Sequence, residues 1–131
     1  MDRFLNEECN PKLMSPLALA FVGDTVYDLF VREKLLCEAN RQVKKLHNEA
    51  VKSVRASAQA EAYEKIKNIL TQEEADIFRR GKNAHTTHIP KNSNELEYHI
   101  ATGMECLFGY LYLSNRIDRL RELFYIIYKE G

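Results

Sequence analysis

Residues 16–31 read PLALAFVGDTVYDLFV, a nearly continuous apolar run that only Asp24 and Asp28 interrupt. A second run, residues 100–113, reads IATGMECLFGYLYL and contains Glu105 as its single charge. Both runs have the composition of buried helices, and at least one glycine lies close to the acid in each. This pattern predicts two largely apolar helices that pack side by side at the centre of the fold.

The acids in these two runs are unusual because an ionised carboxylate in an apolar interior is costly unless a cation, hydrogen-bond donors or a metal compensate it. We therefore expect Asp24 and Glu105 to lie in the interior and to converge. Converging carboxylates repel each other unless a divalent cation holds them, and Mg²⁺ commonly takes one or two carboxylates together with substrate phosphate. This favours a phosphodiester hydrolase in which Asp24 and Glu105 are the metal-binding and catalytic residues.

Other interpretations of these acids stay open at this point. Either residue alone could be a core acid bonded to an arginine, a lysine or helix N–H groups. Asp28 is better explained as an ion-pair partner of Arg32, one helical turn later, than as a third member of the site.

Length and composition are those of a single globular domain, residues 1–131, with 45% hydrophobic and 29% charged residues. Lys plus Arg equals Asp plus Glu at 19 each, so a polyanion site would have to be a local basic patch. The three cysteines form no C-x-x-C pair and suit a reducing compartment. No signal peptide or membrane-length apolar run is evident, which predicts a cytoplasmic protein with no membrane partner.

Helix signals divide the rest of the chain. Ser15 followed by Pro16 is a helix start, Thr71 with Glu74 forms a capping box, and Asn94 starts a further helix. Gly81 has the features of a helix C-cap. We expect helices over residues 16–37, 43–70 with a break near Ser53, 71–81, 94–114 and 117–127. No strand pattern competes with them, so the predicted fold class is all-α.

Residues 81–94, GKNAHTTHIPKNSN, form the one long predicted loop, and no acid occurs between Asp76 and Glu95. Such a segment suits phosphates and ribose 2′-hydroxyls, which the minor groove of A-form RNA presents, although a solvated loop would explain the same bias. The candidate RNA-binding residues are Arg80, Lys82, Asn83, His85, Lys91 and Asn92. A second basic set, Lys44, Lys45, Lys52 and Arg55, is interpreted as solvated surface, because we expect these residues not to share one helical face.

The two apolar runs resemble the two metal-binding helices of the ribonuclease III family. The segment LAFVGDTVYDLFV is similar to the family signature acid-x-L-E-F-L-G-D-S, and ATGMECLFGYLYL is similar to D-A-x-E-A-L-I-G-A-x-Y-L. The loop RRGKNAHTTHIPKN resembles the RGRNA…PKN stretch of the short Mini-III branch, which lacks a double-stranded-RNA-binding domain. The resemblance covers essentially the whole chain and implies a single ribonuclease III catalytic domain.

Carried over position by position, the resemblance places the G-D-S aspartate on Asp24 and the glutamate of the second motif on Glu105. Three positions that are acidic in the wider family are Leu17, Ala20 and Thr102 here. The implied metal site therefore has fewer carboxylates than that of full-length ribonuclease III, and the number of Mg²⁺ ions per site is left open. Mn²⁺ is the expected substitute for Mg²⁺.

The resemblance also implies partners. It predicts a homodimer that cuts double-stranded RNA, in particular the stem of the 23S ribosomal RNA precursor, with a ribosomal protein on that precursor as a further partner. An alternative is a non-catalytic ribonuclease III-like scaffold that binds RNA or ribosomal protein; the missing acids at Ala20 and Thr102 argue for it, and the retained Asp24 and Glu105 argue against it. A helical nucleotide hydrolase would need paired acids, and the adjacent Glu73 and Glu74 suit a helix N-terminus on the surface better.

Overall fold

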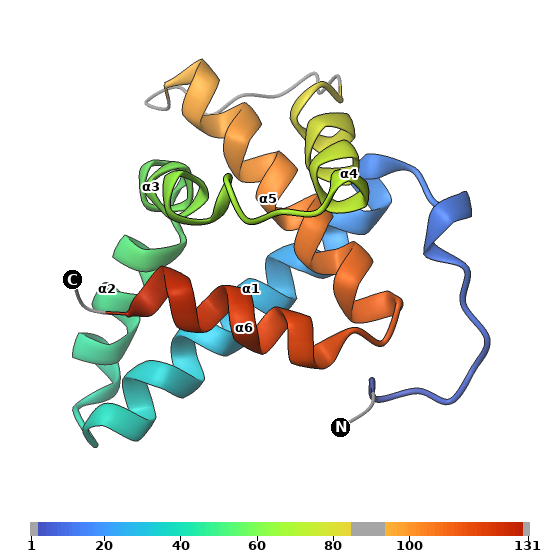
Figure 1. Ribbon diagram of the computed structural model, residues 1–131. Coiled ribbons are helices and arrows are strands. Elements are labelled where there is room, and N and C mark those ends of the chain that lie inside the picture. The colour runs from blue at the N-terminus through green and yellow to red at the C-terminus, as the bar shows by residue number, and fades with distance from the viewer. Residues whose placement is uncertain (1–2, 85–93, 130–131) are drawn as a thin grey trace.

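The computed structural model describes residues 3–84 and 94–129, and these fold as helices joined by short connections (Figure 1). The elements are η1 (Pro11–Leu13, a 3₁₀ helix), α1 (Pro16–Glu38), α2 (Val43–Val54), α3 (Ala56–Ile66), α4 (Gln72–Lys82), α5 (Glu95–Leu113) and α6 (Ile117–Tyr128). The described ranges contain no strand, which confirms the all-α prediction. None of the described helices has both the length and the apolar character needed to cross a bilayer.

The helix α5 is the centre of the molecule. Most of its residues from Ala101 to Leu111 are buried, and four other helices, α1, α3, α4 and α6, pack against it (Figure 1). The core that results is aromatic as well as aliphatic, with the Phe108 ring stacked on Tyr27 of α1 at a centroid distance of 5.3 Å. Burial on this scale explains why a 131-residue chain forms a complete core.

The backbones of α1 and α5 are in direct contact, and glycine makes this possible. A Cβ atom on Gly23 would lie 1.6 Å from the carbonyl oxygen of Glu105, and one on Gly109 would lie 2.0 Å from the carbonyl oxygen of Leu19. Either methyl group would push the helices apart. The prediction that the two apolar helices pack side by side at the centre is confirmed, and the point of closest approach is next to the two acids.

The helix starts follow the predicted capping signals. The Ser15 hydroxyl accepts a hydrogen bond from the Ala18 amide at 3.2 Å, and Thr71 and Glu74 form both bonds of a capping box. The predicted break after α2 occurs at Arg55, two residues beyond Ser53.

The prediction that Gly81 caps α4 is wrong. The helix continues to Lys82 and its C-cap is Asn83. Gly81 has no positive φ, and it is a glycine because a Cβ there would lie 2.5 Å from the Cβ of Cys106 on α5. Close helix packing, rather than a turn, explains this residue.

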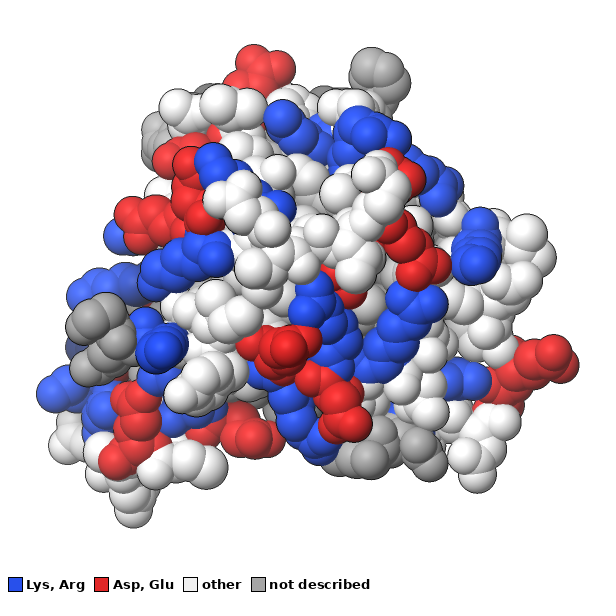
Figure 2. Space-filling model, viewed as in Figure 1, with Lys and Arg blue, Asp and Glu red and all other residues white. Residues whose placement is uncertain are grey.

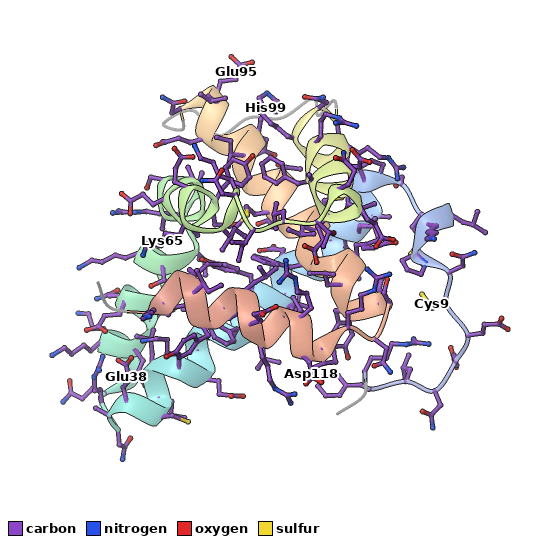
Figure 3. The ribbon with its side chains drawn as sticks, viewed as in Figure 1. Cys9, Glu38, Lys65, Glu95, His99 and Asp118 are labelled. Carbon is purple, nitrogen blue, oxygen red and sulfur yellow. The ribbon has the colours of Figure 1, made fainter. Side chains whose placement is uncertain are left out.

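Charged side chains such as Glu95 and Asp118 lie at the periphery (Figure 3). Glu74 differs from them, because it is only 2% exposed and forms a 2.7 Å ion pair with Arg119 of α6. The expectation that it is a surface acid is therefore wrong. Its carboxylate completes the α4 cap and joins α4 to α6, so the cost of burying it is offset by several donors.

Candidate active site

Asp24 of α1 and Glu105 of α5 meet where the two helices cross. Burial and, after it, the neighbouring charge of Asp24 together raise the pKa of the Glu105 carboxyl to about 7. A carboxylate that is both desolvated and close to a second one is poised to bind a cation. The structure thus brings together the two acids that the sequence singled out.

The two acids differ in burial, and the expectation that both lie in the interior is wrong for Asp24. Its side chain is exposed, whereas that of Glu105 is half-buried. The helix α1 also presents apolar residues to solvent, including Phe21 at 81% and Leu29 at 52% exposure. Apolar neighbours along this helix therefore do not imply an interior position.

Gln59 of α3 is a site residue that sequence reasoning missed. It is 2% exposed, and its Nε2 donates to the Glu105 carboxylate at 3.3 Å and to the Val54 carbonyl at 2.8 Å. A signal was present, because Gln59 shares the buried face of α3 with Ala62 and Ile66 at helical spacing. A polar residue on that face of an amphipathic helix indicates a buried polar contact.

The residues at the crossing fit a hard divalent cation held by few protein ligands. Two carboxylates converge there, and within the described ranges no third His, Cys, Asp or Glu joins them to form a larger cluster. Mg²⁺ commonly uses one or two carboxylates and keeps several waters. At two of the positions where the resemblance to ribonuclease III implies acids, Ala20 is buried and the Thr102 hydroxyl donates to the Tyr98 carbonyl at 3.0 Å.

The remaining acids considered from the sequence are engaged elsewhere. Asp28 forms a 3.1 Å ion pair with Arg32, which confirms the interpretation given for it. Glu73 accepts hydrogen bonds from Arg116 at 2.6 Å and from the Tyr110 hydroxyl at 2.7 Å. Together with the Glu74 ion pair, these bonds leave no basis for a second acidic site on α4.

The basic C-terminal end of α4 packs against α5 close to Glu105. Gly81 contacts Cys106, the residue after Glu105, and its neighbours Arg80 and Lys82 extend from the same turn. Figure 2 shows Lys and Arg side chains gathered over this part of α4 on the face displayed. Of the RNA-binding candidates, Arg80, Lys82 and Asn83 are described, and Arg80 and Asn83 are exposed. The other three, His85, Lys91 and Asn92, lie outside the described residues.

A second basic surface lies on α2. Successive helical positions advance by about 100°, so Lys44, Lys45 and Lys52 fall within an arc of about 100°. All three are exposed, and the opposite side of the helix carries the buried Ala50. Arg55, the fourth member of the set, lies at the break after α2 and is also exposed, so the interpretation of the set as solvated surface stands.

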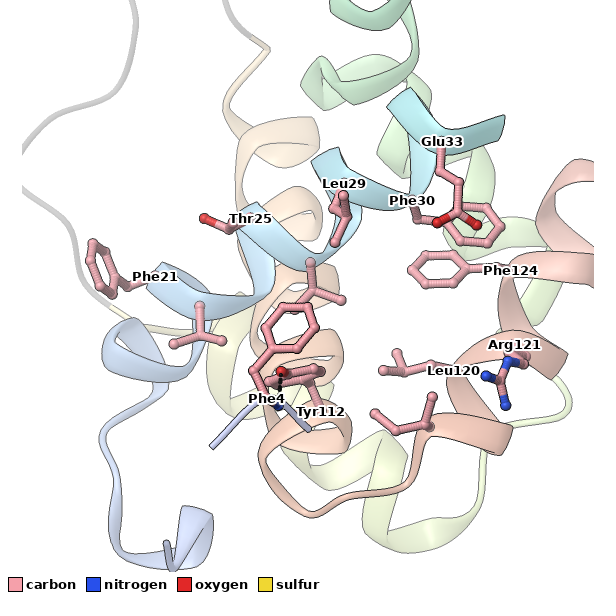
Figure 4. Close-up of a pocket in the computed structure, with 13 residues that line it drawn as sticks. Phe4, Phe21, Thr25, Leu29, Phe30, Glu33, Tyr112, Leu120, Arg121 and Phe124 are labelled. Carbon is pink, nitrogen blue, oxygen red and sulfur yellow. Dashed lines mark hydrogen bonds between the residues drawn. The ribbon is translucent and has the colours of Figure 1, made fainter. Parts of the chain in front are cut away.

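An apolar groove of about 480 Å³ runs along the other side of α1 (Figure 4). Phe21, Leu29 and Phe30 of α1 line it, together with Phe124 of α6 and Phe4 near the N-terminus. The Phe4 amide donates to the Tyr112 hydroxyl at 2.8 Å, which ties the N-terminal segment to α5 at one end of the groove.

Comparison with known proteins gives concordant results. The family model described as Ribonuclease III domain matches residues 17–116. The chain is 46% identical over 110 residues to Mini-ribonuclease 3 of Thermoanaerobacter sp. (strain X514), which covers 84% of this chain and 78% of the relative. It is 43% identical over 114 residues to Mini-ribonuclease 3 of Symbiobacterium thermophilum, covering 87% and 88%. A crystal structure from Fusobacterium nucleatum superposes with a TM-score of 0.79 at 31% identity, covering 88% of each chain.

Proposed function

Because the chain belongs to the ribonuclease III family and is an endoribonuclease, we propose that it cleaves double-stranded RNA and that Asp24 and Glu105 hold the Mg²⁺ ion on which cleavage depends. Mn²⁺ is the proposed substitute.

The observation that carries this proposal is the contact of α1 with α5 at Gly23 and Gly109. It brings two carboxylates together at a point where their repulsion and the burial of Glu105 both oppose ionisation. A protein that only binds RNA gains nothing from this arrangement. A metal-dependent hydrolase gains from it, because a divalent cation between the two carboxylates replaces their mutual repulsion with attraction to the cation.

Different residues of the chain would bind the metal and the RNA. Glu105 is half-buried and Asp24 is exposed, so the pair would supply one ligand held against the core and one that faces the solvent from which RNA arrives. Arg80 and Lys82, with Asn83, lie at the end of α4, where they would contact backbone phosphates and riboses. Mg²⁺, when bound, supplies charge neutralisation at the reacting phosphate and a more acidic water.

The apolar groove supports the homodimer. Phe21 and Leu29 would expose a large apolar surface in a monomer, and a second copy bound on the same face would cover it. Two copies related by a twofold axis would also provide two catalytic sites for one RNA duplex, one for each strand.

The finer substrate follows from the family resemblance. We propose the stem of the 23S ribosomal RNA precursor, and a ribosomal protein bound to that precursor as a further partner. The scaffold alternative rests on the absence of acids at Ala20 and Thr102 alone, and both the retained Asp24 and Glu105 and the family of endoribonucleases to which the chain belongs argue against it.

A cleavage assay distinguishes the metal-dependent endoribonuclease from the non-catalytic scaffold. The purified protein is incubated with a labelled RNA duplex, and with its separate strands, in Mg²⁺, in Mn²⁺ or in EDTA. We expect discrete cuts in the duplex that require the metal and are absent from the single strands. Binding of the duplex with no cleavage in either metal would instead support the scaffold.

A further inference from the structure

The side-chain amide of Gln59 lies between two acceptors and has one orientation that satisfies both. The Val54 carbonyl can only accept, and so can the Glu105 carboxylate in the ionised form that would bind a cation, so the NH₂ group faces both of them, at 2.8 Å and 3.3 Å. Exchanging the oxygen and nitrogen of the amide would place an oxygen against two oxygens. The hydrogen-bond network therefore fixes the direction of this amide.

This orientation leaves the side-chain oxygen of Gln59 without a hydrogen bond from the described residues, a cost in stability that a purely structural residue would avoid. The Oε1 atom of Gln59 is buried and has no hydrogen-bond partner in the described part of the chain. A buried acceptor without a partner destabilises the fold, and such groups call for a specific explanation. An apolar side chain would fill the same space in the α3 face without this cost.

The hydrogen bond to the Val54 carbonyl holds the Gln59 amide in place. Val54 is the last residue of α2, and its carbonyl is one of those that the end of a helix leaves without a helical partner. Gln59 satisfies this carbonyl with one N–H and extends the other N–H to Glu105 of α5. The break between α2 and α3 is thus connected through one side chain to the candidate metal ligand.

We propose that Gln59 is a positioning residue that holds the Glu105 carboxylate in the orientation in which it binds the divalent cation. The inference rests on the proposed function, because it assigns Gln59 a role toward the proposed metal site. Donors to the second oxygen of a metal-binding carboxylate restrict its rotation, and removing such outer hydrogen bonds typically weakens metal affinity about 10- to 100-fold. Gln59 itself stays outside the set of metal ligands, because its oxygen points away from Glu105.

The test compares Gln59→Met with the wild-type protein. Methionine has a similar length and lacks the donor. Tyr128→Phe is the matched control, because it removes another part-buried hydrogen bond, the 3.2 Å bond to the Tyr27 hydroxyl, which involves neither Asp24 nor Glu105. Binding of Mn²⁺ without RNA is measured by the decrease of the free-ion electron paramagnetic resonance signal. The Mg²⁺ concentration for half-maximal cleavage and the thermal midpoint are measured alongside.

We expect Gln59→Met to weaken Mn²⁺ binding about 10-fold or more and to raise the half-maximal Mg²⁺ concentration by a similar factor, with cleavage recovering at saturating Mg²⁺. Tyr128→Phe should lower the thermal midpoint and leave Mn²⁺ affinity unchanged. Wild-type affinity in Gln59→Met, with only a lower thermal midpoint, would reduce Gln59 to a helix cap and overturn the proposal. If wild type and Asp24→Asn bind Mn²⁺ equally, the proposed metal site itself is wrong.

A measurement on the folded wild-type protein covers the case in which Gln59→Met does not fold. The side-chain amide resonances of Gln59 are followed by nuclear magnetic resonance during a Mg²⁺ titration. They should shift with Mg²⁺ in the wild type and stay in place in Glu105→Gln. Unchanged Gln59 resonances in a wild-type protein that binds Mg²⁺ would contradict the positioning role.

Discussion

At the scale of single residues, the pair Asp24 and Glu105 combines opposite environments. Glu105 is half-buried on α5, and Asp24 faces solvent from α1. The sequence was sufficient to select both residues, because a charge inside an apolar run is conspicuous. It was not sufficient to give their burial or to reveal Gln59, since both depend on which face of a helix packs against its neighbours.

The raised pKa of Glu105 predicts how the stability of the metal-free protein depends on pH. The folded protein retains a proton on this carboxyl up to about pH 7, whereas the unfolded chain loses it near 4.5. The folded state therefore binds more protons between these values, and the free energy of unfolding falls as pH rises through this window, by up to about 3 kcal/mol. Urea unfolding in EDTA at pH 5 and pH 8 measures the change.

Glu105→Gln is the control for this prediction, because it removes the titrating group and keeps the shape. The fall in stability between pH 5 and pH 8 should be smaller in Glu105→Gln than in the wild type. Mg²⁺ added to the wild type at pH 8 should restore stability, since a ligand of the folded state stabilises it. Equal pH dependence in both proteins would mean that Glu105 ionises normally.

The cations at the end of α4 predict the salt dependence of RNA binding. Affinity for an RNA duplex should fall steeply with salt, and Arg80→Ala should make that slope shallower by about one unit or less, because one cation no longer neutralises a phosphate. Arg79→Ala is the control on the same helix, because Arg79 is already paired with Asp76 at 2.9 Å. Affinity that does not change with salt would remove α4 from the RNA-binding surface.

At the scale of helices, local signals and packing contributed differently to what could be predicted. The start of α1 at Ser15, the capping box at Thr71 and the break near Arg55 depend on residues close in sequence, and these predictions are confirmed. The prediction that Gly81 is a C-cap is wrong because glycine is required there by a contact with Cys106, which lies 25 positions further along the chain. The 3₁₀ helix η1 was not predicted either.

The crossing of α1 and α5 predicts that a glycine-to-alanine substitution lowers stability, whereas helix propensity alone would predict that it raises stability. Alanine normally stabilises a helix interior by about 0.5–1 kcal/mol relative to glycine. Gly23→Ala should instead destabilise the fold by about 3 kcal/mol or more, because its Cβ would lie 1.6 Å from the Glu105 carbonyl oxygen. Chemical denaturation measures the difference, with Ala18→Gly at an exposed position of α1 as the propensity control. A stabilised Gly23→Ala protein would show that the helices are not in backbone contact.

At the scale of the whole molecule, the uncovered apolar groove on α1 supports self-association. In the sequence, it was the family resemblance that pointed to a homodimer. The all-α fold class was predictable because helix signals extend over most of the chain. The arrangement of the groove was not, because it combines residues from α1, α5, α6 and the N-terminal segment.

The groove predicts the oligomeric state of two matched variants. Phe21→Asp should convert the dimer to a 15.3 kDa monomer, since it places a charge in the apolar groove. Val43→Asp should remain dimeric, because Val43 is equally exposed, at 80% against 81%, and lies outside the groove. Light scattering coupled to size-exclusion chromatography gives the masses. A monomeric wild type, or a dimeric Phe21→Asp, would place the interface elsewhere.

The assignment of Asp24 and Glu105 to catalysis rather than to folding underlies the proposed function. The decisive measurement is cleavage of a labelled RNA duplex in Mg²⁺ by Asp24→Asn and by Glu105→Gln, beside the wild type, with circular dichroism and mass measured on the same samples. We predict that both variants lose cleavage while helical content, dimer mass and duplex binding are retained. Undiminished cleavage in either variant, or a decrease of helical signal together with activity, would contradict this assignment.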